Sequence, residues 1–157
     1  MKPVKLKDIV DEMEMQMDEY HKYLNKETGE IVTVSTEELT IAEESEEDDD
    51  FSEYPDWQRD SIKDALDVIV NWENYIELPD KWEINEYDIM EEFCGSIRND
   101  RISNVLYTAI QGRGAFRRFK DAIIRFEVED DWYKFREEAL KQIAIEWCEE
   151  NEIKYIV

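Results

Sequence analysis

One stretch in the second half of the chain decides the fold: Gln111-Gly112-Arg113-Gly114-Ala115-Phe116-Arg117-Arg118-Phe119-Lys120-Asp121. Two of the chain's four glycines interrupt the sequence here and predict a hinge. Apolar residues then recur at three- and four-residue spacing, which predicts a helix over Ala115–Phe126. We expect Phe116 and Phe119 to anchor this helix inward, while its arginines stay outside.

Similar apolar spacing marks helices on both sides of the hinge. Four glycines and three prolines in 157 residues leave few helix breakers, so about five or six helices are expected. They cover the approximate ranges Leu6–Met15, Pro55–Trp72, Asn85–Gly95, Ile102–Ile110, Ala115–Phe126 and Asp130–Glu150. Most of the five tryptophans lie within or at the ends of these apolar patterns, and we expect them in the core. The alternative is an exposed aromatic patch that anchors a partner.

The N-terminal third carries a β-hairpin pattern. Two β-prone runs within residues 19–34 flank a polar turn in which Gly29 can adopt positive φ. Ser35 followed by Glu38 forms the pattern of a capping box at a helix start. The β-prone tail Ile153–Val157 could add a third strand. The sequence therefore predicts a helix-dominated α+β fold with a small antiparallel sheet, in a single domain over residues 1–157.

Charge is distributed unevenly. The chain has 42 acidic and 19 basic residues, a net charge of −23, and the run Glu43–Asp50 is acidic at seven of eight positions. Self-repulsion predicts a mobile segment at about 43–53. By contrast, Arg98–Arg125 has seven basic and two acidic residues, a local charge of +5, which leaves −28 for the remainder.

This composition bounds the partners and the compartment. Duplex nucleic acid and anionic membranes would be repelled, so neither is expected as a direct partner. No signal peptide or membrane helix is recognisable, and Cys94 and Cys148 match no disulfide framework, so we expect a cytoplasmic protein with two buried thiols.

The hinge carries the candidate ligand-binding residues Gly112, Arg113, Gly114, Arg117, Arg118 and Lys120. A helix N-terminus with nearby arginines can bind a phosphate, a carboxylate or an acidic peptide. The alternative is a structural corner between two helices, whose arginines pair with the chain's own acids.

Other chemistry finds little support in the sequence. His21 is the only histidine, and nothing pairs it with a nucleophile, so it is expected to be structural. The acidic run lacks the ligand spacing of a calcium loop. No catalytic residue, metal ligand or cofactor is predicted.

The run from Leu106 to Asp121, with Trp132–Arg136, Ala144–Cys148 and Tyr23–Glu30, resembles an uncharacterised bacterial protein family of unknown function with an AIQGRGAFRRFKD-type signature. The resemblance implies a bacterial cytoplasmic protein and supplies no reaction. Three hypotheses remain for an otherwise unknown function. We favour a non-enzymatic interaction or regulatory protein that binds another protein. The alternatives are a binder of, or an enzyme acting on, a small anionic ligand at Gly112–Arg118, and a nucleic-acid mimic.

Overall fold

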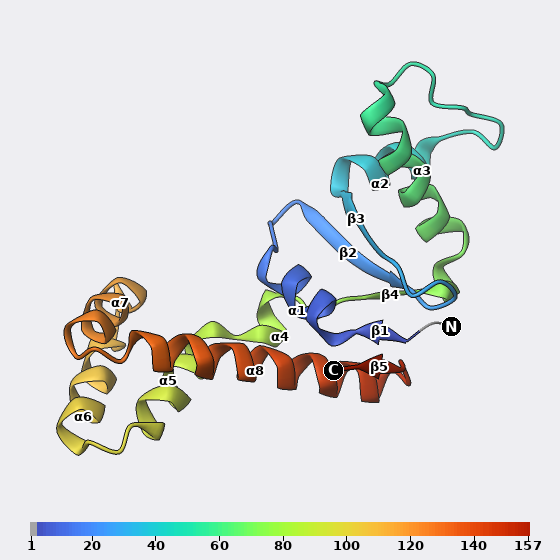
Figure 1. The fold of residues 1–157 in the computed structure, drawn as a ribbon. Coiled ribbons are helices and arrows are strands. Elements are labelled where there is room, and N and C mark those ends of the chain that lie inside the picture. The colour runs from blue at the N-terminus through green and yellow to red at the C-terminus, as the bar shows by residue number, and fades with distance from the viewer. Residues whose placement is uncertain (1–2) are drawn as a thin grey trace. The chain divides into compact units, whose positions relative to one another are not determined.

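The computed structural model describes residues 3–157 and confirms a helix-dominated α+β fold (Figure 1). In that part of the chain, seven helices have nine or more residues and accompany a three-stranded antiparallel sheet. Contacts divide the chain into two compact units: one reaches to Asp80 and includes Ala144–Val157, and the other is Lys81–Ile143. The expectation of one domain stays a prediction.

The sheet of the first unit is built on the predicted hairpin. Strands β2 (Tyr20–Asn25) and β3 (Ile31–Ser35) pair antiparallel, with Leu24 opposite Ile31. The turn between them closes because the Asn25 side chain accepts the Glu27 N–H, and Gly29 adopts a φ of 78°. A side chain at Gly29 would be strained in this left-handed conformation.

The third strand is not the C-terminal tail, so that expectation was wrong. Strand β4 (Tyr75–Glu77) takes the free edge of β2 and gives the order β3-β2-β4. The tail strand β5 (Tyr155–Ile156) instead pairs parallel with β1 (Val4–Lys5).

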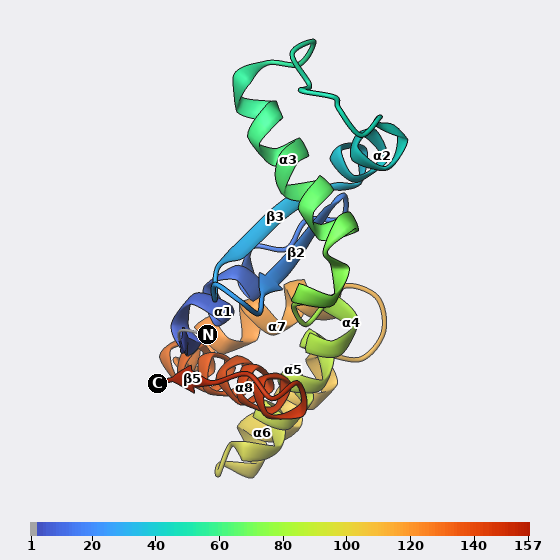
Figure 2. The same cartoon turned by 90° about the vertical axis from the view of Figure 1, so that its right-hand side faces the viewer.

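Besides the end of the last helix, this unit contains three helices and one short turn: α1 (Leu6–Glu14), α2 (Thr36–Glu44), α3 (Asp56–Val70) and the 3₁₀ turn η1 (Trp72–Asn74). The predicted capping box starts α2, since Ser35 Oγ accepts the Glu38 N–H and Glu38 Oε1 accepts the Ser35 N–H. The ion pair between Lys22 Nζ and Glu12, at 2.5 Å, links β2 to α1. The long loop between α2 and α3 is seen in Figure 2, and Phe51 in this loop is buried in a cluster with Val34, Ala42, Ile62 and Ala65.

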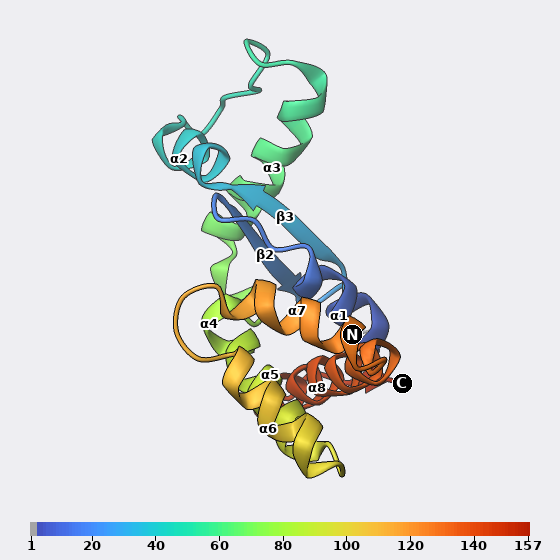
Figure 3. The ribbon, with the colours of Figure 1, turned by 90° about the vertical axis from the view of Figure 1, so that its left-hand side faces the viewer.

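The second unit is helical. It contains α4 (Lys81–Ile84), α5 (Glu86–Ser96), α6 (Asp100–Ala109), α7 (Ala115–Arg125) and α8 (Glu129–Glu150) as far as Ile143. Figure 3 shows the loop that carries the chain from α6 into α7. The core is aromatic: the ring centroids of Phe93 and Trp132 lie 5.3 Å apart, and those of Phe119 and Trp132 lie 4.8 Å apart in an edge-on arrangement. Such pairs add to the free energy gained by burial alone.

The tryptophans divide between core and surface, so the expectation of a core role was only partly right. Trp132 and Trp147 are buried, whereas Trp57 is 74% exposed and Trp72 is 68% exposed. Trp57 lies in the first turn of α3, before its buried stripe begins at Ile62, and Trp72 lies beyond the helix. The side chain of Trp82 lies outside the described part.

Candidate functional site

The hinge between α6 and α7 is a tight turn whose backbone geometry requires glycine at two positions. Gly112 and Gly114 adopt φ values of 73° and 78°, in the left-handed region. A Cβ at Gly114 would also lie 3.0 Å from Nη1 of Arg118. Gly114 serves as N-cap of α7. The sequence predicted the hinge and the helix that follows it.

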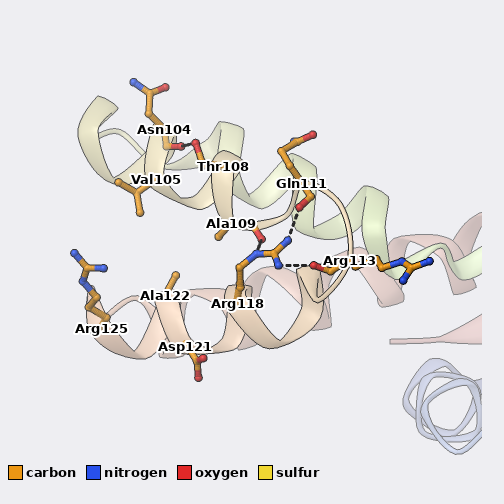
Figure 4. A pocket seen from close by; sticks show the side chains of 10 residues that line it. All are labelled: Asn104, Val105, Thr108, Ala109, Gln111, Arg113, Arg118, Asp121, Ala122 and Arg125. Carbon is orange, nitrogen blue, oxygen red and sulfur yellow. Dashed lines mark hydrogen bonds between the residues drawn. The ribbon is translucent and has the colours of Figure 1, made fainter.

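Arg118 folds back to close this turn. Its Nε donates to the carbonyl oxygen of Ala109 at 2.9 Å, and its Nη1 and Nη2 donate to the carbonyls of Arg113 and Gln111 (Figure 4). The guanidinium thus satisfies carbonyl groups where the chain leaves α6. Although Arg118 is a candidate ligand-binding residue, three of its five N–H donors are committed to the backbone.

The two phenylalanines of α7 take opposite positions. Phe119 is 1% exposed and packs edge-on against Phe93 and Trp132. Phe116 is 55% exposed, so the expectation that both rings point inward was wrong for this one. Ala115, Ala122 and Ile123 are buried with Phe119, whereas Phe116 lies at the margin of this buried face and is left uncovered by the packing.

The remaining cations of the hinge face solvent. Arg113, Arg117 and Lys120 are exposed, and none of them forms an ion pair within residues 3–157. The interpretation in which these arginines pair with the chain's own acids is therefore not seen in the described structure. Elsewhere in the second unit, Arg136 pairs with Glu86 at 2.5 Å.

A shallow open hollow of about 740 Å³ lies between α6 and α7. It is lined by Asn104, Val105, Thr108, Ala109, Gln111, Arg113, Arg118, Asp121, Ala122 and Arg125. Figure 4 shows that its cations diverge, because the Arg113 side chain projects away from Arg118, and Arg125 lies toward the other end of α7. Charges spread in this way suit an extended acidic surface better than one small anion.

Sequence reasoning missed a second polar arrangement, around His21. Its Nε2 lies 2.9 Å from Thr36 Oγ1, and its Nδ1 lies 3.8 Å from Glu77 Oε1. These residues belong to β2, α2 and β4, so no local signal could join them. A hydroxyl, an imidazole and a carboxylate in this order resemble a nucleophilic triad. However, the neighbouring hollow is only about 50 Å³ and Thr36 does not line it, so we assign His21 a structural role.

Burial of the two cysteine side chains keeps their thiols unreactive. Cys94 and Cys148 are free, buried thiols, as the sequence predicts. Burial raises the pKa of each to about 11, which keeps both protonated near neutral pH. Within the described residues, no group of three His, Cys, Asp or Glu side chains is placed to hold a metal ion.

The described structure defines a helical unit that presents a basic helix on an acidic chain, and comparison with known sequences supplies its family. The chain belongs to the uncharacterised protein family UPF0158, whose profile matches residues 1–157. It is similar to the UPF0158 protein PA5073 of Pseudomonas aeruginosa, with 30% identity over 67 residues. That match covers 42% of this chain and 44% of the relative's length. No solved structure matches, and none of the helices described for residues 3–157 is long and apolar enough to span a membrane.

Proposed function

We propose that this chain is a non-enzymatic interaction protein of the bacterial cytoplasm, and that it binds an acidic polypeptide through the outer face of α7. We call this surface the α7 face and define it by Phe116, Arg117, Lys120 and Ile124. Arg113 lies beside it, in the preceding turn. The single observation that carries the proposal is the combination of exposed apolar side chains with cations that lack ion pairs in the described structure.

The apolar members of the α7 face support a protein partner. Phe116 and Ile124 are 55% and 60% exposed, in a helix whose adjoining side is well packed. An aromatic ring beside arginines is the composition found at the energetic centres of protein interfaces. A partner that covered these side chains would remove apolar surface from water and also neutralise the cations.

The charge pattern supports an acidic partner. The segment Arg98–Arg125 carries +5, whereas the rest of the chain carries −28. The summed field of such a chain opposes a long polyanion such as duplex nucleic acid, which extends over many charged residues. A short acidic segment can contact the α7 face alone, within the screening length of about 8 Å at physiological salt.

The compartment is part of the proposal. The relative in Pseudomonas aeruginosa supports a bacterial setting. Both cysteines are unpaired thiols, which suits a reducing compartment.

Binding to a defined acidic polypeptide tests this function. The probe is a random copolymer of glutamate and tyrosine, which offers carboxylates and aromatic rings, titrated at moderate salt and followed by isothermal calorimetry. The double variant Arg117→Glu with Lys120→Glu should weaken binding at least about tenfold, because two attractions become repulsions. The matched control is Arg98→Glu with Arg101→Glu, which makes the same change of charge outside α7. Equal loss in both variants, or no binding by the natural chain, would contradict the proposal.

A further inference from the structure

We infer that the α7 face of one copy binds the acidic segment of a second copy of this chain. The inference rests on the proposed function and names a partner for the same surface. It begins from the observation that this chain itself carries a segment with the complementary chemistry.

The α7 face forms one continuous strip. At the helical repeat of about 100° per residue, its four members fall within an arc of about 100°. The buried side chains Ala115, Phe119, Ala122 and Ile123 occupy the adjoining arc of the helix, which begins beside Phe116. The strip therefore contains both apolar and cationic side chains, and none of them is among the buried residues of the helix.

The complementary surface lies at the α2–α3 loop of the first unit. The acidic segment Glu43–Asp50 is exposed at all seven of its carboxylates. Trp57, which follows in the first turn of α3, is 74% exposed. The carboxylates are complementary in charge to the cations of the α7 face. The exposed indole of Trp57 can pack against the exposed apolar side chains of Phe116 and Ile124.

Local hydrogen bonds and one buried ring hold this loop. Asp49 Oδ1 accepts the Phe51 N–H at 2.8 Å, and Asp50 Oδ1 accepts the Ser52 N–H at 3.0 Å. The Phe51 ring is buried in the core cluster of the unit. The loop is thus anchored at Phe51, while the carboxylates before it and Trp57 after it remain accessible to another molecule.

Net charge does not prevent this contact at physiological salt. Two copies of charge −23 repel each other at long range, but screening over about 8 Å suppresses that repulsion. Carboxylates and guanidinium groups in direct contact lie well inside this distance. Opposed patches can therefore attract although the whole molecules have the same sign.

Sedimentation velocity of the full chain at near-physiological salt tests the inference. We expect the weight-average sedimentation coefficient to rise with concentration across the micromolar range. Trp57→Ala and Phe116→Ser should each weaken self-association about tenfold, because each removes an apolar anchor. Val70→Ser and Tyr133→Ser are the matched controls. They remove an exposed apolar side chain of α3 and an exposed ring of α8 outside the proposed contact, and should leave self-association unchanged.

A second measurement separates the two proposals. A synthetic peptide of residues 43–57 is titrated into the Trp57→Ala chain, whose α7 face is intact. If the peptide binds and Phe116→Ser abolishes that binding, while the natural chain sediments as a monomer, the partner assignment fails and the proposed function stands. If the peptide and the glutamate–tyrosine copolymer both fail to bind, both proposals fail. Concentration-dependent association that Trp57→Ala and Phe116→Ser both reduce, with the two controls unchanged, supports the second copy as the partner.

Discussion

At the scale of single residues, the two phenylalanines of α7 have different roles: Phe119 stabilises the fold, and Phe116 belongs to the proposed binding surface. Phe119 lies in the aromatic core, so Phe119→Ala should lower the free energy of unfolding by about 3–5 kcal/mol. Phe116 is exposed, and Phe116→Ala should change that free energy by less than about 0.5 kcal/mol. Urea denaturation followed by circular dichroism measures both. Similar losses in the two variants would mean that Phe116 is also part of the core.

Arg118 gives a second test at this scale. Arg118→Met keeps an unbranched chain but removes the donors to three carbonyls, so we expect a loss of about 1–2 kcal/mol in this solvated turn. Arg117→Met is the control, since Arg117 has no ion pair in the described structure. Hydrogen exchange should accelerate at residues 111–114 in the Arg118 variant alone. Unchanged exchange there would show that Arg118 does not fasten the turn.

At the scale of elements, Tyr75 joins α3, β4 and β2. Its hydroxyl donates to the Asp67 carboxylate and accepts a hydrogen bond from Asn25 Nδ2 at 3.3 Å. Burial, followed by the interaction with Asp67, raises the pKa of Tyr75 to about 12. The unfolded chain ionises this tyrosine near pH 10.

The raised pKa predicts how stability depends on alkaline pH. Below pH 10 the hydroxyl is protonated in both states, so its stabilising contribution is fully present. Between pH 10 and about 12 the unfolded state ionises first, and this contribution is lost as pH rises. The stability advantage of the natural chain over Tyr75→Phe should therefore shrink across this interval in urea denaturation. An advantage that is constant from pH 8 to 12 would contradict the assignment.

Elements with local signals were predictable, whereas long-range partners were not. The hairpin, the capping box and the hinge before α7 follow from turn residues and short spacings in the sequence. The pairing of β1 with β5 joins opposite ends of the chain. Phe116 and Phe119 both fit a helical pattern, and only the three-dimensional packing decides which ring is covered. The backbone bonds of Arg118 likewise depend on the fold of the turn.

At the scale of the whole molecule, helix α8 contributes residues to both compact units. We expect the chain of 157 residues to unfold in one cooperative transition, as one domain. Trp132 belongs to the second unit and Trp147 to the first, and both are buried. In a variant whose only tryptophan is Trp132, the fluorescence midpoint in urea should coincide with the midpoint of the far-ultraviolet circular dichroism signal, which reports on the helices of both units. Separate midpoints would show two independently unfolding domains.

The most direct test of the central claim is an NMR titration of the ¹⁵N-labelled chain with the peptide of residues 43–57. The account predicts amide shifts concentrated over residues 113–125, with the largest changes beside Phe116, Arg117 and Lys120. It also predicts that Phe116→Ser with Arg117→Glu removes these shifts while the remaining spectrum is preserved. Shifts absent from α7, or unaffected by those substitutions, would contradict the assignment of this helix as the binding surface.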